Sequence, residues 1–223
     1  MALILNIETA TTNCSVSLSR EGKTIVLKED NSKNYSHAES LHVFIDAVLK
    51  EANITSKDLD AVAISKGPGS YTGLRIGVSA AKGLCFALDI PLISVPTLEA
   101  LAHQVDANEG VIVTMLDARR LEVYAAIFDS NKKEIKATEA QVLDENAFAD
   151  ELARGNVYFI GNGVEKTKTL INHTNAVFID AKLPSANEMS LLAYKKYRNK
   201  DFENVAYFEP YYLKDFVALK SSK

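Results

Sequence analysis

Some segments of this chain alternate apolar and polar residues as strands do, and others repeat them with the period of a helix. Segments of these two kinds follow one another in the same order in both halves of the chain. The first half begins with an apolar run and two alternating segments, which predict a strand meander. Helical patterns separated by short apolar runs follow, and Ser36 with Glu39 has the spacing of a capping box. The predicted elements are strands at 2–8, 14–20 and 23–28, a helix at 36–52, a strand at 60–65, a helix at 72–88, a strand at 90–95 and a helix at 97–104.

The second half repeats this order with weaker signals. Its predicted elements are strands at 111–116, 121–128 and 134–142, a helix at 144–153, a strand at 157–160, a turn at 161–163, a helix at 188–200 and a final segment at 207–214. We therefore expect an α/β fold with two related halves, each a mixed sheet flanked by helices. Residues 1–100 form the first part and 101–223 a smaller second part, with the last segment packing back on the first.

Composition narrows the class of protein. The 223 residues include 24% charged residues and carry a formal charge of −4, which argues against a free-standing nucleic-acid binder. Cys14 and Cys85 stand in apolar surroundings and predict buried thiols. No basic leader precedes a long apolar run, and the helix at 72–88 contains Arg75 and Lys82, so we expect a cytoplasmic protein without a membrane span.

The segment 67–77 (GPGSYTGLRIG) is the most distinctive motif of the chain. It turns a strand into a helix, and no lysine followed by serine or threonine comes after its last glycine, so it is not a Walker loop. Gly67 and Gly69 allow positive φ, and the following helix start offers free N–H groups to an anion. Between an anion site and a plain turn, the residues favour the turn.

The helices at 36–52 and 72–88 have more apolar surface than one buried face needs. Each has a single narrow polar stripe, and the second adds small residues at Gly73, Gly77 and Ala81 that permit close helix packing. Either both helices lie inside one domain or they form an interface, and the pattern favours the interface. The residues expected to contact a partner are Leu41, Phe44, Ile45, Val48, Leu74, Val78 and Lys82.

Several motifs together resemble the TsaB (YeaZ) family. They are residues 4–11 (ILNIETAT), 37–39 (HAE), the segment 67–77, 117–120 (DARR) and 210–213 (PYYL), and the resemblance covers almost the whole chain. It implies the actin-like, Hsp70-like ATPase (ASKHA) fold and a non-catalytic subunit that pairs with TsaD. It also implies that TsaE joins the complex, which transfers threonylcarbamoyl to the adenosine next to the tRNA anticodon.

The same resemblance implies a homodimer in the absence of TsaD and only indirect contact with tRNA. It implies no cofactor on this chain alone, with ATP and metal held by the partner subunits. In the actin-like fold the first hairpin turn binds phosphate, but Glu8 stands where aspartate is usual and 117–120 lacks a glycine. We therefore expect only a vestigial nucleotide or anion site, formed by Glu8, Thr9, Thr11, Gly67, Gly69 and Asp117.

Other chemistries are weaker alternatives. His37 and His42 are five apart, roughly 140° around a helix, so they do not share a metal as histidines four apart would. No G-x-S-x-G elbow or cysteine–histidine signature is present. An actin-like small-molecule kinase or ATPase is the second hypothesis and a metallopeptidase the third. Tyr211, Tyr212 and the basic stretch 195–198 offer stacking and charge to tRNA, although a solvated helix face explains the basic stretch more simply.

Overall fold

The computed structural model describes residues 2–32 and 37–214 and contains two five-stranded sheets of the same topology. The first has the order β3-β2-β1-β4-β5, in which β1 pairs antiparallel with β2 and parallel with β4. Its strands are β1 (Leu3–Glu8), β2 (Cys14–Arg20), β3 (Lys23–Asp30), β4 (Ala61–Ser65) and β5 (Leu92–Val95). Every predicted strand of the first half is therefore present.

The second sheet has the order β10-β9-β6-β7-β8, with β6 antiparallel to β7 and parallel to β9. Its strands are β6 (Val111–Asp117), β7 (Glu122–Asp129), β8 (Glu134–Val142), β9 (Val157–Ile160) and β10 (Ala176–Ile179). Each sheet is thus a three-strand meander whose first strand is extended by two parallel strands. The expectation of two related halves is confirmed.

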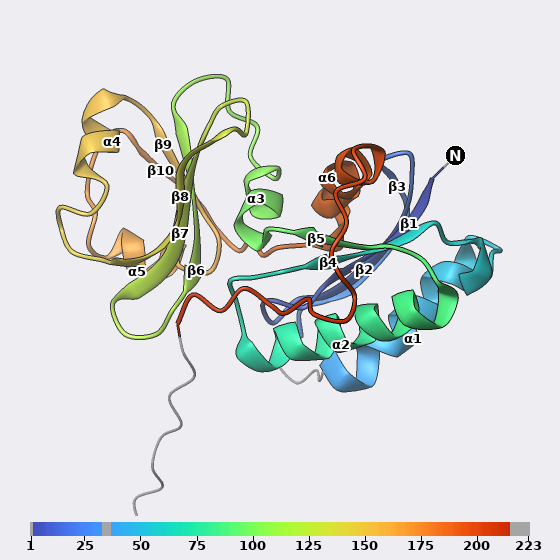
Figure 1. Ribbon diagram of the computed structural model, residues 1–223. Coiled ribbons are helices and arrows are strands. Elements are labelled where there is room, and N and C mark those ends of the chain that lie inside the picture. The colour runs from blue at the N-terminus through green and yellow to red at the C-terminus, as the bar shows by residue number, and fades with distance from the viewer. Residues whose placement is uncertain (1, 33–36, 215–223) are drawn as a thin grey trace, which may run out of the picture.

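Helices cover both faces of the first sheet (Figure 1). Helices α1 (His37–Glu51) and α2 (Tyr71–Leu88) lie on one face, and α6 (Ala186–Arg198) lies on the other. The short helix α3 (Thr97–Ala102) packs its buried leucines between the two sheets. Because α6 follows the second sheet in sequence but packs on the first, the end of the chain returns to the first half.

Short elements account for the differences from prediction. The helix expected at 144–153 begins only at α4 (Ala149–Arg154), because Asp144 accepts a hydrogen bond from the Asn146 N–H and Phe148 has a left-handed φ of 62°. Helix α5 (Val164–Lys168), the 3₁₀ turn η1 (Ser56–Asp58) and β10 were not predicted, and residues 207–214 form no helix or strand. The capping role predicted for Ser36 lies outside the described residues.

Each face of each sheet has its own core. Leu41, Ile45 and Val78 belong to the cluster under α1 and α2, while Met189 and Ala193 of α6 pack on the opposite face. The second sheet is covered by α4 and α5 on one face and by α3 on the other. Within the described residues, none of the helices combines the length and apolarity that a membrane span requires.

Candidate functional site

Two concave surfaces meet at the N-terminal end of α2. The first, which we call the inter-sheet cleft, has a volume of about 620 Å³ and lies between the two halves. The second, the helix groove, has a volume of about 710 Å³ and lies between α1 and α2. Both are lined by Tyr71 and Thr72, so α2 contributes to both surfaces.

Four segments supply most of the lining of the inter-sheet cleft. The first hairpin turn contributes Thr11, the glycine loop contributes Gly69, and the β6–β7 turn contributes Asp117 and Arg119. The fourth segment is the strap, residues 203–214, whose last four residues line the cleft. The structure therefore brings together Thr11, Gly69 and Asp117, three of the six residues expected at a vestigial nucleotide site.

The other three expected residues do not line the cleft. Glu8, at the end of β1, and Thr9, the first residue of the hairpin turn, are fully buried, and Gly67 is buried next to the Tyr211 carbonyl, which a Cβ at Gly67 would approach to 2.8 Å. Gly67 has a φ of +105°, so this position needs a glycine for its conformation as well as for space. The expectation that these three residues face a ligand is therefore wrong for this conformation.

Glu8 is a carboxyl group enclosed by the protein. Its Oε1 accepts hydrogen bonds from the Ala10 N–H at 2.6 Å and the Ser65 hydroxyl at 2.8 Å, whereas Oε2 has no partner among the described residues. Burial raises the pKa of Glu8 from 4.5 to about 7, and these hydrogen bonds oppose the shift only in part. Glu8 thus ties the first hairpin turn to the end of β4 and offers no exposed ligand to a metal ion.

The glycine loop packs on the first hairpin turn backbone to backbone. The Ser70 N–H donates to the Ala10 carbonyl at 2.7 Å, and a Cβ at Gly69 would lie 2.4 Å from that same oxygen. The Ser70 side chain then accepts from the Gly73 N–H at 3.3 Å and caps α2. These contacts give the motif a structural role in fixing where α2 begins.

Gly73 and Gly77 bring α2 against the same turn. A Cβ at Gly73 would lie 2.1 Å from the Thr9 carbonyl, and one at Gly77 would lie 2.2 Å from Thr9 Oγ1. Ala81, the third small residue, is also buried in the core under α2. The small residues therefore permit close packing within this chain, and the prediction that they admit a partner's helix is wrong.

The second turn of the cleft presents an unusual pair of arginines. Arg119 and Arg120 both have positive φ, 69° and 51°, and the Arg119 N–H donates to Asp117 Oδ1 at 2.7 Å. Lys166 of α5 reaches the same turn, where it pairs with Asp117 at 2.6 Å and donates to the Arg120 carbonyl at 2.8 Å. The turn is thus held in place with the exposed Arg119 at the cleft.

Metal binding has no support in the part of the chain that the structure describes. No group of three or more histidine, cysteine, aspartate or glutamate side chains there is placed to hold an ion. His37 donates from Nε2 to the Thr11 carbonyl at 2.7 Å, while His42 lines the helix groove. Cys14 and Cys85 are buried thiols whose pKa is raised to about 11 by burial, as the sequence predicted for their location.

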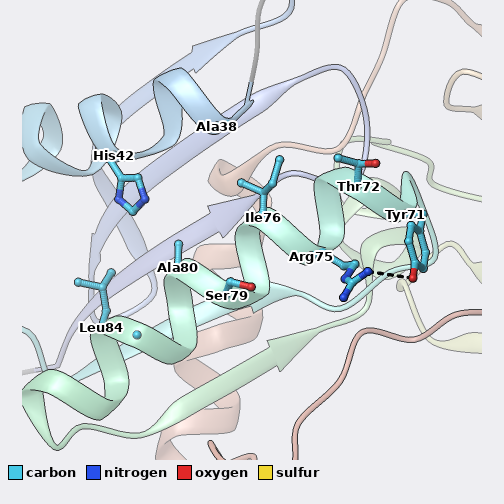
Figure 2. Close-up of a pocket in the computed structure, with 10 residues that line it drawn as sticks. Ala38, His42, Tyr71, Thr72, Arg75, Ile76, Ser79, Ala80 and Leu84 are labelled. Carbon is cyan, nitrogen blue, oxygen red and sulfur yellow. Dashed lines mark hydrogen bonds between the residues drawn. The ribbon is translucent and has the colours of Figure 1, made fainter.

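The helix groove is mostly apolar. Figure 2 shows His42 pointing into it from α1, with Ile76, Ala80 and Leu84 rising from α2. Val43 and Phe86 lie on the same two helices and are 60% and 86% exposed. Large apolar side chains at this exposure on neighbouring helices are typical of an interaction surface.

The residues predicted to form that surface lie elsewhere. Five of the seven are buried against the first sheet, because they occupy the inward faces of α1 and α2: Leu41, Ile45, Val48, Leu74 and Val78. Phe44 is partly buried and packs against the same core. For these residues the predicted surface location is wrong, and the groove-lining residues above were not predicted.

Lys82 also has an intramolecular role. Its Nζ donates to the carbonyls of Ala206 and Phe208 at 3.2 and 2.9 Å and so fastens the strap to α2. Further along, the Tyr211 N–H donates to the Lys66 carbonyl at 2.7 Å, and the Tyr212 ring packs on Tyr71 with centroids 5.1 Å apart. Lys82 therefore holds the strap against α2, which the isolated helix pattern did not reveal.

The end of the strap reaches the second half. Lys214 pairs with Glu122 of β7, and Leu213 and Lys214 line the inter-sheet cleft. The tyrosines singled out in the sequence, Tyr211 and Tyr212, line the cleft, whereas the basic stretch 195–198 lies at the end of α6 on another element. The two groups proposed together for tRNA contact are therefore on different elements.

Comparison with known proteins identifies the family. A family model described as "TsaD: tRNA N6-adenosine threonylcarbamoyltransferase" matches residues 31–221. The chain is 30% identical over 226 residues to the Escherichia coli (strain K12) "tRNA threonylcarbamoyladenosine biosynthesis protein TsaB", covering 97% of this chain and 96% of that protein. The Haemophilus influenzae protein of the same description is 29% identical over 229 residues, covering 97% and 95%.

Solved structures agree with this result. A Pseudomonas aeruginosa protein described as having similarity to peptidase YEAZ superposes with a TM-score of 0.85 at 25% identity, covering 96% of this chain and all of that one. "YeaZ from Pseudomonas aeruginosa" superposes with a TM-score of 0.79 at 26% identity and the same coverage. The chain belongs to the TsaB (YeaZ) family and has the actin-like ASKHA fold, with two related halves.

Proposed function

We propose that this chain is a non-catalytic subunit of the machinery that transfers a threonylcarbamoyl group to the adenosine next to the tRNA anticodon, and that it pairs with TsaD through the helix groove. Family membership supports the pathway, since the relatives are described as tRNA threonylcarbamoyladenosine biosynthesis proteins. The observation that carries the pairing is the apolar groove between α1 and α2, two helices that also carry the exposed Val43 and Phe86.

The chemistry of the rest of the chain supports a scaffold role. Glu8 is fully buried, and no cluster of candidate metal ligands is found among the described residues. ATP and metal belong to the partner subunits in this proposal, TsaE joins through the assembled complex, and tRNA is contacted indirectly. Without TsaD the groove is free to pair with a second copy of the chain. We place the complex in the cytoplasm, with no membrane attachment.

The residues that line the groove suit the centre of an interface. A standard interface buries about 800 Å² on each partner, with apolar anchors at its centre and a polar rim. Ile76, Ala80 and Leu84 offer the apolar centre, and Arg75 with Ser79 offers polar groups at its side. Phe86 supplies a ring that would be covered only by another molecule.

Gly83 gives a sharp test of this pairing. It lines the groove, and a Cβ at this position would meet nothing within 4 Å, so the isolated chain can accommodate a larger side chain. Gly83→Glu should leave the fold intact, because glutamate is also a better helix former than glycine, but it places a charge in the interface. We expect it to abolish co-purification with TsaD and to reduce threonylcarbamoyl transfer in a reconstituted reaction.

Leu191→Glu is the matched control. Leu191 is an exposed leucine on α6, on the opposite face of the first sheet from the groove, so the same charge there should leave pairing unchanged. Undiminished pairing of Gly83→Glu with TsaD would rule out the groove as the contact surface. Turnover of substrates by the isolated chain would instead contradict the non-catalytic role and favour the kinase or ATPase alternative.

A further inference from the structure

The inter-sheet cleft does not fit the magnesium nucleotide that the actin-like fold usually holds. Magnesium with polyphosphate is usually bound through one or two carboxylates together with the phosphates and water. Among the described residues, Asp117 is the only carboxylate that lines the cleft, and its Oδ1 accepts from Lys166 at 2.6 Å and from the Arg119 N–H at 2.7 Å. Glu8, on the strand that leads to the first hairpin turn, is fully buried. The described lining therefore supplies a metal ion with a single carboxylate, which is already ion-paired with Lys166.

The cleft nevertheless has a local excess of positive charge in a chain of net charge −4. Arg119 and Lys214 line it, and Lys166 lies behind Asp117. Lys166 and Lys214 are paired with Asp117 and Glu122, but among the described residues no ion pair or hydrogen bond engages the Arg119 guanidinium. An exposed guanidinium whose backbone is fixed by its neighbours is suited to bind a phosphate or carboxylate in a bidentate manner.

Aromatic rings line the same cleft from both halves. Tyr124 comes from β7, whereas Tyr211 and Tyr212 come from the strap. The Tyr211 and Tyr212 residues are 42% and 37% exposed although the Tyr211 backbone is hydrogen-bonded to Lys66 and the Tyr212 ring rests on Tyr71. Partly exposed tyrosines held on a fixed backbone are typical stacking platforms for nucleobases.

Hydroxyl groups complete the lining. Thr11, Ser70 and Thr72 lie on the side of the first half, and each can donate to a sugar or phosphate oxygen, whereas the Thr12 hydroxyl donates to Asn31 Oδ1 at 2.7 Å. The volume of about 620 Å³ lies within the range of small-molecule sites, which is about 300–1,000 Å³. The volume, the positive charge and the aromatic lining of the cleft therefore all suit a small planar ligand that carries one anionic group.

We propose that the inter-sheet cleft binds a nucleoside monophosphate unit without a metal ion, with the base against the strap tyrosines and the phosphate at Arg119. The unit is either a free nucleotide or one residue of a single-stranded RNA, since both present the same base and phosphate. The proposal is independent of pairing with TsaD, because Arg119 and the strap tyrosines do not line the helix groove.

Isothermal titration calorimetry of the full chain in the presence of EDTA tests the proposal. We expect adenosine monophosphate to bind with a stoichiometry of one, more tightly than adenosine or inorganic phosphate alone. Mg²⁺ with ATP should bind no better than adenosine monophosphate in EDTA. A single-stranded RNA of about six nucleotides distinguishes the sources: tighter binding than the mononucleotide assigns the site to RNA, and weaker binding assigns it to free nucleotides.

Two arginines of one turn provide matched variants. Arg119→Ala should weaken binding of adenosine monophosphate by about tenfold or more and leave adenosine unaffected, since an ion-paired hydrogen bond is lost. Arg120→Ala should bind as the parent does, because Arg120 has the same left-handed backbone but does not line the cleft. Tyr212→Leu should weaken both ligands. Three results would each overturn the proposal. They are the absence of heat with millimolar adenosine monophosphate, metal-dependent binding of ATP that is tighter than binding of adenosine monophosphate, and unchanged binding by Arg119→Ala.

Discussion

Replacing Glu8 by glutamine should make the chain more stable at alkaline pH. The Glu8 carboxyl is fully buried and its pKa is raised from 4.5 to about 7, so charging it above pH 7 costs free energy in the folded state. At about 1.4 kcal/mol for each tenfold change, this difference corresponds to about 3 kcal/mol. Glutamine keeps an oxygen that accepts from the Ala10 N–H and the Ser65 hydroxyl but never becomes charged.

The sign follows from proton linkage. Between pH 4.5 and 7 the folded chain keeps the Glu8 proton that the unfolded chain has lost, so the free energy of unfolding falls as pH rises through this window. The penalty is absent below pH 4.5 and complete above pH 7. We therefore expect Glu8→Gln to exceed the stability of the parent by about 1 kcal/mol or less at pH 5 and by up to about 3 kcal/mol at pH 8.

Urea denaturation followed by circular dichroism, repeated between pH 5 and pH 8, measures this effect. Burial also raises the pKa of Glu99 and Glu188, so only the difference between variant and parent isolates Glu8. Glu145→Gln, at an exposed position in the turn before α4, is the control and should follow the parent at every pH. A difference between Glu8→Gln and the parent that does not change with pH would refute the reasoning.

Four further substitutions test the packing. Leu74→Ala should cost about 2–5 kcal/mol in urea denaturation, because this side chain is 1% exposed, and a loss below 1 kcal/mol would contradict its place in the core. Gly77→Ala should lower the free energy of unfolding by about 1–3 kcal/mol through the clash with Thr9. Gly83→Ala should raise it by about 0.5–1 kcal/mol, because a Cβ there meets nothing within 4 Å. Equal melting temperatures for these two variants would contradict the assigned faces of α2. Lys82→Met should speed amide exchange along the strap, as mass spectrometry would detect, and unchanged exchange would mean that the lysine does not fasten it.

Local periodicity was sufficient for most of the longer elements. β8 lies at the residues predicted, and α2 begins one residue before its predicted start, because Ser70 caps it where the glycine loop ends. Elements of four or five residues, such as β10 and α5, span too little chain for a period to be distinguished. The late start of α4 depends on an Asp144 side-chain bond that competes with the helix.

The candidate site was harder to predict because helix patterns do not say what covers each face. The apolar positions of α1 and α2 were recognised correctly, yet those expected at a partner face the first sheet instead. Gly73 and Gly77 were predicted to allow close approach of another helix, although the residue that approaches them is Thr9 of the first hairpin turn. Lys82 could not be assigned either, since its acceptors are carbonyls more than 120 residues away. Each of these errors therefore arose because the position of a residue depends on contacts with segments far away in the sequence.

The two surfaces can still be separated by experiment although α2 joins them. Tyr71 and Thr72 line both the inter-sheet cleft and the helix groove, so a substitution at either position would disturb both and could not assign an effect. Gly83 lines only the groove and Arg119 lines only the cleft. The surfaces act independently if Gly83→Glu no longer pairs with TsaD but keeps its nucleotide affinity, and if Arg119→Ala pairs with TsaD but has lost nucleotide affinity. Loss of both functions in either variant would instead mean that α2 and the strap couple the two surfaces.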